Sequence, residues 1–403
     1  MSENHAIVFG ASGVNGWAVV NALLQGYPSE DAFASVTALT NRPVSLQDTL
    51  WPKSPKLDLV SGIDLLADAK LETLEDELKR KVANADKITH VYFFVTTLRA
   101  LIHLAYIMDA DPKAEVHKNT ELVKRSVLAI QNVSSHLKFV VLGTGAKSYG
   151  SHLLEQFPFR DQVPLKESLP RMPEPFASQI FYYHQVDQLS WISQGKSWSF
   201  CELMPDLVVG FVPNNNYYCM AQILATYLAL YAKINGKGSE VVFPGTQRSW
   251  ECLSQDSSQD VIAKTAIYAS LHPQETAGQR YNVTDSARPA SWSEKWPVIC
   301  EYFGLRGTGP RDGVAGPVPN EYLVEHYNEW RELEKEEGLK TGRVGNNKSY
   351  GDFARVMMTL CDLDRQLDMS KTHAMMGSAK VETDSRGAWW TAFDRFRRAK
   401  IIP

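Results

Sequence analysis

The chain has few cysteines and no long apolar run. Its 403 residues contain 5 cysteines, none in a pair with metal-ligand spacing. This usage favours a reducing compartment and predicts no metal site. No apolar stretch is long enough to span a bilayer, so we expect no membrane partner. No charged and apolar leader precedes the first predicted strand, so we also expect no secretory signal and a cytoplasmic protein.

An excess of basic charge is also missing. The formal net charge is −4, which argues against a nucleic-acid partner. The composition, 44% hydrophobic and 22% charged, is ordinary for a globular protein, and the length suggests about two domains. We therefore expect a small-molecule partner, and a homodimer remains open.

The first residues carry the clearest positive signal. Residues 5–9 read as a short apolar strand, residues 10–16 as a glycine turn and residues 17–24 as a helix. A dinucleotide fold opens in this way, because glycines let the backbone approach a pyrophosphate that faces the helix N-terminus. The alternative is an ordinary tight turn. The predicted cofactor contacts in this turn are Gly10, Ser12, Gly13 and Val14.

Strands alternate with helices through the first half of the chain. The predicted strands are 36–40, 56–60, 90–95, 138–142 and 199–209, and the predicted helices are 71–83, 120–132 and 179–193. This alternation predicts an α/β fold with a doubly wound parallel Rossmann sheet. A long loop is expected at 151–177, and beyond 213 we expect helices at 220–234, 292–303 and 321–338, a short strand at 280–283 and a linker at 304–319.

Two domains follow from this pattern. Residues 1–212 are expected to form the NADP-binding Rossmann domain, with part of 240–290 returning to it. Residues 213–403 are expected to form a smaller, mainly helical substrate-binding cap, because helices rich in aromatic residues suit the wall of a ligand site.

The residues after the second strand bear on the choice of cofactor. A carboxylate there favours NAD, whereas this chain has Asn41 and Arg42, and a guanidinium can pair with a 2′-phosphate. NADP(H) is therefore predicted, with a plain surface arginine as the alternative. Asp64 is a candidate for the adenine amino group. The other predicted cofactor contacts are at strand ends: Val95, Thr96, Pro205 and Val208.

The usual catalytic lysine is missing from its helix. Short-chain reductases pair a tyrosine with a lysine four residues later, but Val186 and Asp187 follow Tyr182 and Tyr183 at that distance. Lys147, after the fifth strand, is a candidate replacement. A solvated surface lysine and two core tyrosines remain the alternative. The run 143–148 is similar to a phosphate loop, but Ala146 and Val141 stand where its glycines belong.

Several motifs together resemble the progesterone 5β-reductase/iridoid synthase (PRISE) family, atypical members of the extended short-chain dehydrogenases. The resembling segments are Gly10-x-x-Gly13-x-x-Gly16, Thr89-His90-Val91-Tyr92, Thr144-Gly145-Ala146-Lys147-Ser148-Tyr149, Ser168-Leu169-Pro170-Arg171, Phe181-Tyr182-Tyr183, Ser370-Lys371-x-His373 and Ala399-Lys400-Ile401-Ile402-Pro403. The Phe-Tyr-Tyr element with a displaced lysine is the most specific of these.

The resemblance implies an NADPH-dependent reduction of an activated C=C bond. A tyrosine hydroxyl supported by the lysine would stabilise the enolate oxygen; Tyr182, with Tyr183 as fallback, and Lys147 stand at those positions. The predicted substrate-pocket residues are Thr97, Tyr149, Met204 and Phe353.

The sequence also departs from the family pattern near the nicotinamide end. Ile180 replaces an asparagine, Val186 an acid, Met204-Pro205-Asp206 an Arg-Pro-Gly, and Thr97 a tryptophan. The first hypothesis is thus a reductase of an enone, enal or iminium in a bulky, mostly apolar substrate of specialised metabolism. An isomerase or cyclase on the same NADP-binding fold is the alternative, and an NADP-sensing regulator of the NmrA type is the third.

Overall fold

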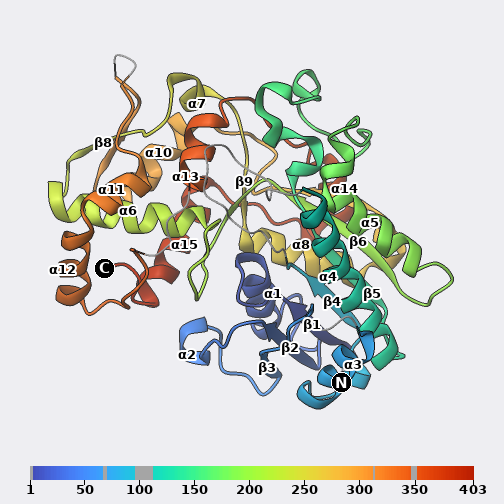
Figure 1. The fold of residues 1–403 in the computed structure, drawn as a ribbon. Helices are drawn as coiled ribbons and strands as arrows, with labels where there is room; N and C mark the ends of the chain where they lie inside the picture. The colour runs from blue at the N-terminus through green and yellow to red at the C-terminus, as the bar shows by residue number, and fades with distance from the viewer. Residues whose placement is uncertain (1–2, 67–69, 96–111, 312–313, 346–351) are drawn as a thin grey trace.

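A parallel sheet forms the centre of the molecule. The computed structural model describes residues 3–66, 70–95, 112–311, 314–345 and 352–403. Its seven-stranded sheet has the order β10-β6-β5-β4-β1-β2-β3 (Figure 1). The strands are β1 (His5–Phe9), β2 (Ser35–Thr40), β3 (Leu57–Ser61), β4 (His90–Phe93), β5 (Phe139–Gly143), β6 (Ser199–Pro205) and β10 (Arg280–Val283). The α/β, doubly wound Rossmann prediction is confirmed.

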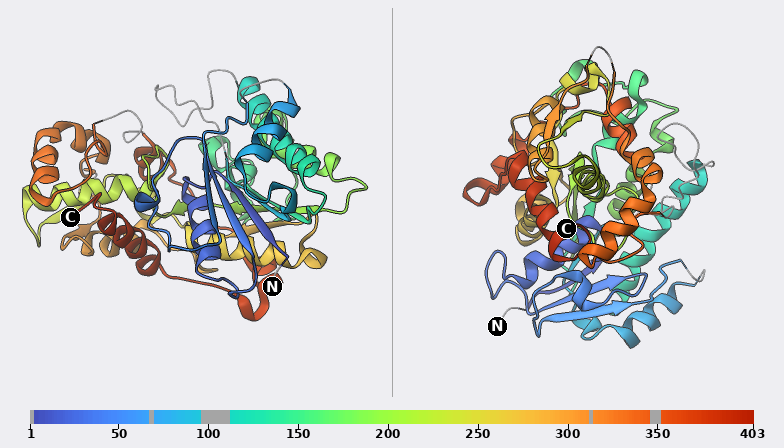
Figure 2. Two further views of the ribbon diagram at one scale, coloured as in Figure 1. Left: turned by 90° about the horizontal axis from the view of Figure 1, so that it is seen from below. Right: turned by 90° about the vertical axis from the view of Figure 1, so that its left-hand side faces the viewer.

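Helices cover both faces of this sheet (Figure 2). On one face α1 (Val14–Leu24) packs against α8 (Gln259–Leu271). On the other lie α3 (Leu71–Lys81), α4 (Pro112–Val133) and α5 (Phe181–Ile192). The central strands are therefore buried on both sides, which explains their nearly continuous apolar sequences.

Several elements differ from the sequence expectation. The expected strand 199–209 divides at Asp206 into β6 and β7 (Leu207–Val209), and β7 pairs instead with β9 (Asp256–Ser258). The expected linker 304–319 contains β11 (Arg306–Thr308), paired with β8 (Glu240–Val242). The expected loop 151–177 contains short helical turns at Ser151–Gln156, Arg160–Gln162 and Ala177–Gln179.

The second half of the chain is mainly helical. Its helices are α6 (Met220–Asn235), α7 (Gln247–Glu251), α9 (Pro273–Thr276), α10 (Trp292–Glu301), α11 (Pro319–Glu325), α12 (Tyr327–Glu337), α13 (Phe353–Arg355), α14 (Ser370–Met376) and α15 (Ser385–Arg398). The expected helix 321–338 is thus two helices that meet at His326. The chain also returns to the sheet, because α8 and β10 lie in the span 240–290.

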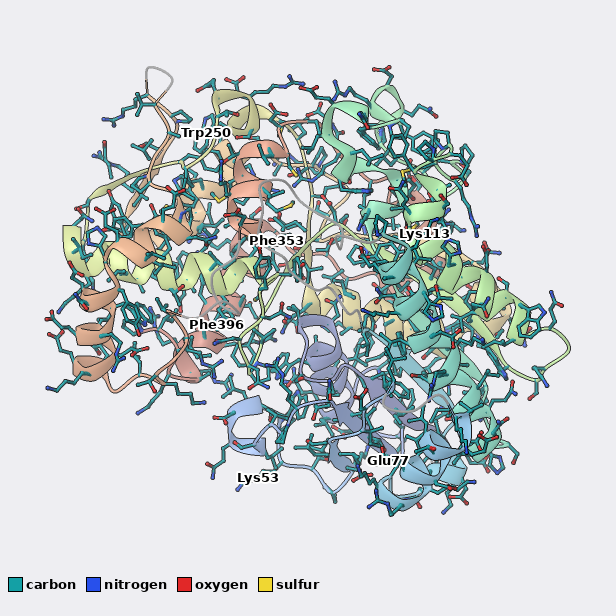
Figure 3. All side chains as sticks on the ribbon, in the orientation of Figure 1. Lys53, Glu77, Lys113, Trp250, Phe353 and Phe396 are labelled. Carbon is teal, nitrogen blue, oxygen red and sulfur yellow. The ribbon has the colours of Figure 1, made fainter. Side chains whose placement is uncertain are left out.

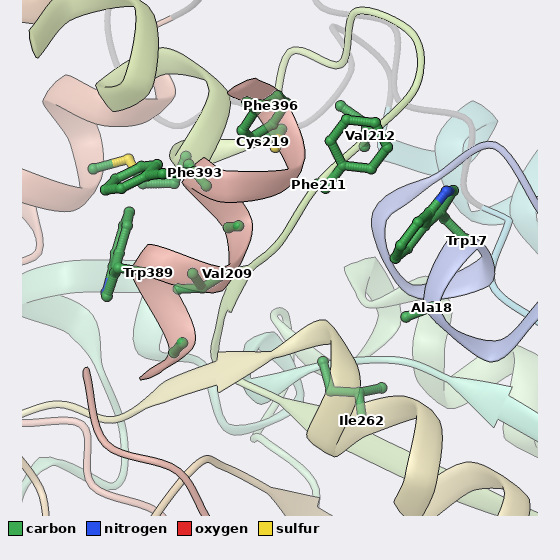
Figure 4. Packing of buried hydrophobic residues seen from close by; sticks show 14 of the residues in the cluster. Trp17, Ala18, Val209, Phe211, Val212, Cys219, Ile262, Trp389, Phe393 and Phe396 are labelled. Atoms are coloured by element: carbon green, nitrogen blue, oxygen red, sulfur yellow. The ribbon is translucent and has the colours of Figure 1, made fainter. Parts of the chain in front are cut away.

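One apolar cluster joins the sheet to the C-terminal helices (Figure 4). The ring of Phe211 lies 5.2 Å from Trp17 of α1 and 5.1 Å from Phe396 of α15, between ring centroids. All three side chains are at most 1% exposed. Burying aromatic rings of this size is among the larger favourable terms in folding, so the C-terminal helices are held firmly over the sheet.

Candidate active site

The glycine turn after β1 has a backbone conformation and close contacts that leave no room for a side chain. Gly10 has a φ of +77°, and a Cβ there would lie 2.7 Å from the Phe94 carbonyl oxygen. A Cβ on Gly16 would lie only 2.3 Å from the Gly10 carbonyl oxygen. The amide of Gly13 donates to that same carbonyl at 2.8 Å. The turn is therefore compact, and α1 starts directly against the strand end.

This turn fits a dinucleotide. Gly13 is the N-cap of α1 and makes no side-chain cap hydrogen bond, so the first amides of the helix are available to an anion. β1 and β4 are neighbours here, and the strand order reverses between them. The half-buried Ser12 and Val14 belong to the same turn, and a Val95 methyl would lie 3.2 Å from a Cβ on Gly10.

The predicted adenosine-side residues lie at the surface. Asn41 and Arg42 directly follow β2 and are exposed. Asp64, after β3, is exposed and its carboxylate accepts from the Leu66 amide at 2.9 Å. Thr96 and Thr97 lie outside the described residues. The carboxyl edge of the sheet thus carries an exposed basic side chain, Arg42, directly after β2.

A second feature lies beyond the ends of β5 and β6. A cavity of about 170 Å³ opens there. Its lining residues are Thr144, Gly145, Ala146, Lys147, Ser151, His152, Tyr182, Pro205, Asp206, Leu207, Val208, Phe353, Met357, Cys361 and Arg365. Figure 3 labels Phe353, which lies near the middle of the molecule in that orientation. Five of the predicted site residues are therefore neighbours in this cavity: Lys147, Tyr182, Pro205, Val208 and Phe353.

Lys147 stands in a helical turn, Ala146–Tyr149, that follows β5. Its ammonium lies 5.7 Å from the centroid of the Phe181 ring. Burial lowers the pKa of Lys147, and the nearby Glu115 carboxylate partly raises it again. When it is protonated, a lysine in this position places a positive charge in a low-dielectric wall, where its field acts strongly on neighbouring charge.

Tyr182 reaches the same cavity from the first turn of α5. A Cβ on Gly145 would lie 3.6 Å from its hydroxyl, so the absence of a side chain at position 145 leaves room beside that oxygen. Burial raises the pKa of Tyr182 well above its ordinary value, so the phenol remains protonated at neutral pH. It can therefore donate a hydrogen bond to an oxygen in the cavity.

Comparison with known proteins assigns this arrangement to a family. Residues 6–403 match the model of the PRISE-like Rossmann-fold domain. The chain belongs to this family. It is 32% identical over 409 residues to the short chain dehydrogenase ausT of Aspergillus calidoustus, covering 100% of this chain and 95% of that protein. It is 24% identical over 407 residues to the 3-oxo-Delta(4,5)-steroid 5-beta-reductase of Arabidopsis thaliana, with 100% and 94% covered.

A solved structure shows the same fold. DesIV, a dTDP-glucose 4,6-dehydratase from Streptomyces venezuelae with NAD and TYD bound, superimposes with a TM-score of 0.60 at 13% identity. The match covers 98% of this chain and 97% of that one. This PRISE-like protein is thus an enzyme of the short-chain dehydrogenase/reductase type with a Rossmann nucleotide-binding fold. In the part of the chain that the structure describes, no helix is long and apolar enough to cross a membrane, and no cluster of three possible ligands is placed to hold a metal.

Tyr183, the next residue after Tyr182, is placed differently. Its hydroxyl donates to the Ser148 carbonyl at 2.5 Å and accepts from the Met172 amide at 3.0 Å. The Arg171 guanidinium lies 4.8 Å from its ring centroid. Tyr183 is not among the residues that line the cavity. Its hydroxyl thus ties α5 to the turn that carries Lys147.

Two predicted pocket residues also lie in the core rather than in the cavity wall. Tyr149 is 1% exposed and donates to Asn282 at 2.8 Å. Met204 is fully buried, and its sulfur lies 3.1 Å from an Arg280 nitrogen. The alternation of strand residues explains Met204, because its neighbour Pro205 points the other way, towards the cavity.

The polar cavity residues that sequence reasoning missed include His152, Asp206 as part of the wall, and Arg365. Burial and the neighbouring Lys147 lower the pKa of His152 to about 3, so its imidazole is neutral. The Arg365 Nε lies 3.0 Å from the Asp206 carboxylate, and both side chains are at most 8% exposed. Position 206 is a visible departure from the family motif, but no local pattern links it to a residue 159 positions away.

Proposed function

We propose that this protein is an NADPH-dependent reductase of an activated double bond, in an enone, an enal or an iminium. One observation carries the proposal: Lys147 and Tyr182, which come from separate segments, line one cavity beyond the ends of β5 and β6. Family membership supports it, as does the steroid 5-beta-reductase among the relatives.

The cofactor would lie along the carboxyl edge of the sheet. Gly10, Ser12, Gly13 and Val14 would hold the pyrophosphate, because the compact turn exposes the first amides of α1. Asn41 and Arg42 would hold the 2′-phosphate and Asp64 the adenine. Val95, Pro205 and Val208 would border the nicotinamide end. When bound, NADPH supplies the hydride that the substrate β-carbon accepts.

With an enone or enal as substrate, the protein's own part in the reaction is to stabilise charge on the substrate oxygen. The protonated Tyr182 hydroxyl donates a hydrogen bond to the carbonyl oxygen, on which negative charge grows during the reduction. The Lys147 ammonium strengthens this through its field. One such donor contributes roughly 3 kcal/mol, or about a hundredfold or more in rate. The α-carbon then takes its proton from solvent, so the residues need no relay to a strong base.

The wall around Phe353 favours a bulky, mostly apolar substrate. The Phe353 ring lies 5.5 Å from Tyr218, which lies 4.9 Å from Tyr217, between ring centroids. Met357 and Cys361 continue this wall on the next helical turns. Aromatic and sulfur-bearing side chains contact hydrocarbon surface well and adapt to its shape.

The test is the stoichiometry of reduction. Purified protein is given NADPH with cyclohex-2-enone or citral, and both the loss of reduced nicotinamide and the formation of saturated product are measured. We expect one NADPH consumed per product, with deuterium from labelled NADPH on the β-carbon. Product formation without NADPH consumption would instead establish the isomerase or cyclase.

Two variants separate the residue roles. Tyr182→Phe and Lys147→Met are each expected to lose most turnover while NADPH binding persists, because neither side chain is assigned to the cofactor. Unchanged turnover in both variants refutes the assigned roles.

A further inference from the structure

Arg365 presents a hydrogen-bond donor that the protein itself does not use. The residue lines the cavity and is 2% exposed. Its Nε lies 3.0 Å from the Asp206 carboxylate, and its Nη1 donates to the Cys361 carbonyl at 3.3 Å. Its Nη2 is buried and has no hydrogen-bond partner among the described residues. Buried donors are nearly always paired, so this nitrogen lacks an acceptor that a ligand in the adjoining cavity could supply.

The guanidinium is held in place from several sides. The Arg365 amide donates to the Leu253 carbonyl at 3.0 Å, and Arg365 forms a backbone bridge with Ser254. Its carboxylate partner is anchored too, because the Asp206 amide donates to the Ser257 hydroxyl at 2.9 Å. The side chain therefore cannot swing away to find another acceptor without breaking these contacts. A rigid, unsatisfied donor in a cavity wall is the usual design of a binding contact.

The surrounding charges restrict the acceptor. Asp206 balances the charge of Arg365, and Glu115 lies near enough to Lys147 to raise its pKa. Glu115 does not itself line the cavity, but together with Asp206 it opposes the two cations, so the cavity and its immediate surroundings carry little net charge. A neutral oxygen, as in a ketone, a hydroxyl or an ester, is therefore a better match than a carboxylate, which would bring an unbalanced charge into a buried site.

We propose that Arg365 is a specificity-determining residue whose Nη2 donates to a second oxygen of the substrate, distinct from the carbonyl that Tyr182 holds. This rests on the proposed function and narrows its substrate class to unsaturated carbonyl compounds with a further neutral oxygen. The cavity of about 170 Å³ has room for the part of a larger substrate that carries the two oxygens, since a cavity of about 150 Å³ holds one benzene ring.

The test compares two probes that differ by one oxygen. We measure kcat/KM with NADPH for 4-hydroxycyclohex-2-enone and for cyclohex-2-enone, and take their ratio for each protein. Arg365→Lys keeps a cation against Asp206 but removes the Nη2 donor. The wild type is expected to favour the hydroxylated probe, and Arg365→Lys to lower the ratio by about tenfold, mostly through KM.

Two further variants serve as controls for this result. Arg395→Lys is the matched control, because Arg395 also pairs with a carboxylate, that of Asp260, but does not line the cavity; its ratio should equal that of the wild type. If Arg365→Lys does not fold, the double variant Arg365→Gln/Asp206→Asn removes both buried charges together and should lower the ratio in the same way. A wild-type ratio that neither Arg365 variant changes overturns the inference.

A binding measurement keeps this inference separate from the reductase proposal. If the wild type reduces both probes without preference, the role of Arg365 is refuted while the reductase stands. If it reduces neither, the reaction with citral decides the reductase proposal, and calorimetry with cyclohexane-1,4-dione and cyclohexanone on the NADP-loaded protein decides the role of Arg365. Tighter binding of the dione that Arg365→Lys abolishes supports it, and the absence of such a preference refutes it.

Discussion

The glycine turn and the cavity are built in opposite ways. The turn is one short stretch, Gly10 to Gly16, and its geometry depends on backbone atoms and on missing side chains. The cavity is assembled from side chains as far apart in the sequence as Thr144 and Arg365. A nucleotide phosphate, common to many enzymes, needs only amides at a helix start, whereas a particular substrate needs side chains whose positions the whole fold determines.

The strongest test of the backbone-built region is Gly16→Ala. We expect loss of NADPH binding together with a large loss of stability, because the new methyl would lie 2.3 Å from the Gly10 carbonyl oxygen, and that oxygen belongs to the backbone of the turn. The measurements are the melting temperature and the NADPH dissociation constant.

Gly278→Ala is the control for this prediction. Gly278 also has a positive φ, +71°, but a Cβ there meets no atom within 4 Å. The control should lose only the strain of the left-handed backbone, about 1–2 kcal/mol, and bind NADPH as the wild type does. If Gly16→Ala behaved like Gly278→Ala, the close approach of α1 to β1 would not matter for the cofactor.

Two consecutive tyrosines test the cavity, the region that is assembled from side chains. Tyr182→Phe should lower kcat by roughly a hundredfold with little change in melting temperature, because the hydroxyl that it removes faces the cavity. Tyr183→Phe should do the reverse. It leaves the Ser148 carbonyl and the Met172 amide without their partner, which costs about 1–3 kcal/mol of stability.

The two variants are compared by steady-state kinetics and thermal unfolding on the same preparations. A large loss of kcat in Tyr183→Phe, with Tyr182→Phe active, would exchange their assignments and make the cavity residue a packing residue.

The same contrast explains what the sequence could predict. The buried strands and the glycine turn carry local signals, in apolar runs and in spacing, and the sheet that they predict is the observed one. The division of 199–209 at Asp206 was missed, because β7 pairs with β9, and strand pairing between distant segments leaves no local pattern. Tyr149 and Met204 were expected in the pocket, but both side chains lie in the core, because contacts with the distant Asn282 and Arg280 hold them there and no local pattern shows those contacts.

Near the glycine turn, Arg42 is the residue that we expect to favour NADPH over NADH. Arg42→Gln should weaken NADPH binding by about tenfold or more and leave NADH binding unchanged, because only the 2′-phosphate would pair with this exposed guanidinium. Lys53→Gln, at another exposed position in the segment between β2 and β3 (Figure 3), serves as the control for general loss of positive charge. If Arg42→Gln weakened NADPH and NADH binding equally, or if Lys53→Gln had the same effect as Arg42→Gln, Arg42 would not be the residue that binds the 2′-phosphate.

The smallest expected effect concerns the cavity, and it is a change in the pH dependence of activity. Burial lowers the pKa of Lys147, so its ammonium is lost at a pH below the ordinary lysine value. Activity that depends on this cation is present at lower pH and falls as the pH rises through that pKa. Tyr182 cannot cause the same fall, because burial moves its pKa upward and keeps the phenol protonated over this range.

The profile of kcat against pH therefore isolates the lysine. The wild type should lose kcat on the alkaline side, and Lys147→Arg should retain residual activity without that loss, because a guanidinium stays charged throughout. Thermal unfolding at each pH separates loss of catalysis from loss of fold. If Lys147→Arg kept the wild-type alkaline limb, the titrating group would be another residue. The cavity would then not depend on the charge of Lys147. The contrast between a turn that acts through backbone atoms and a cavity that acts through a charged side chain would be weaker.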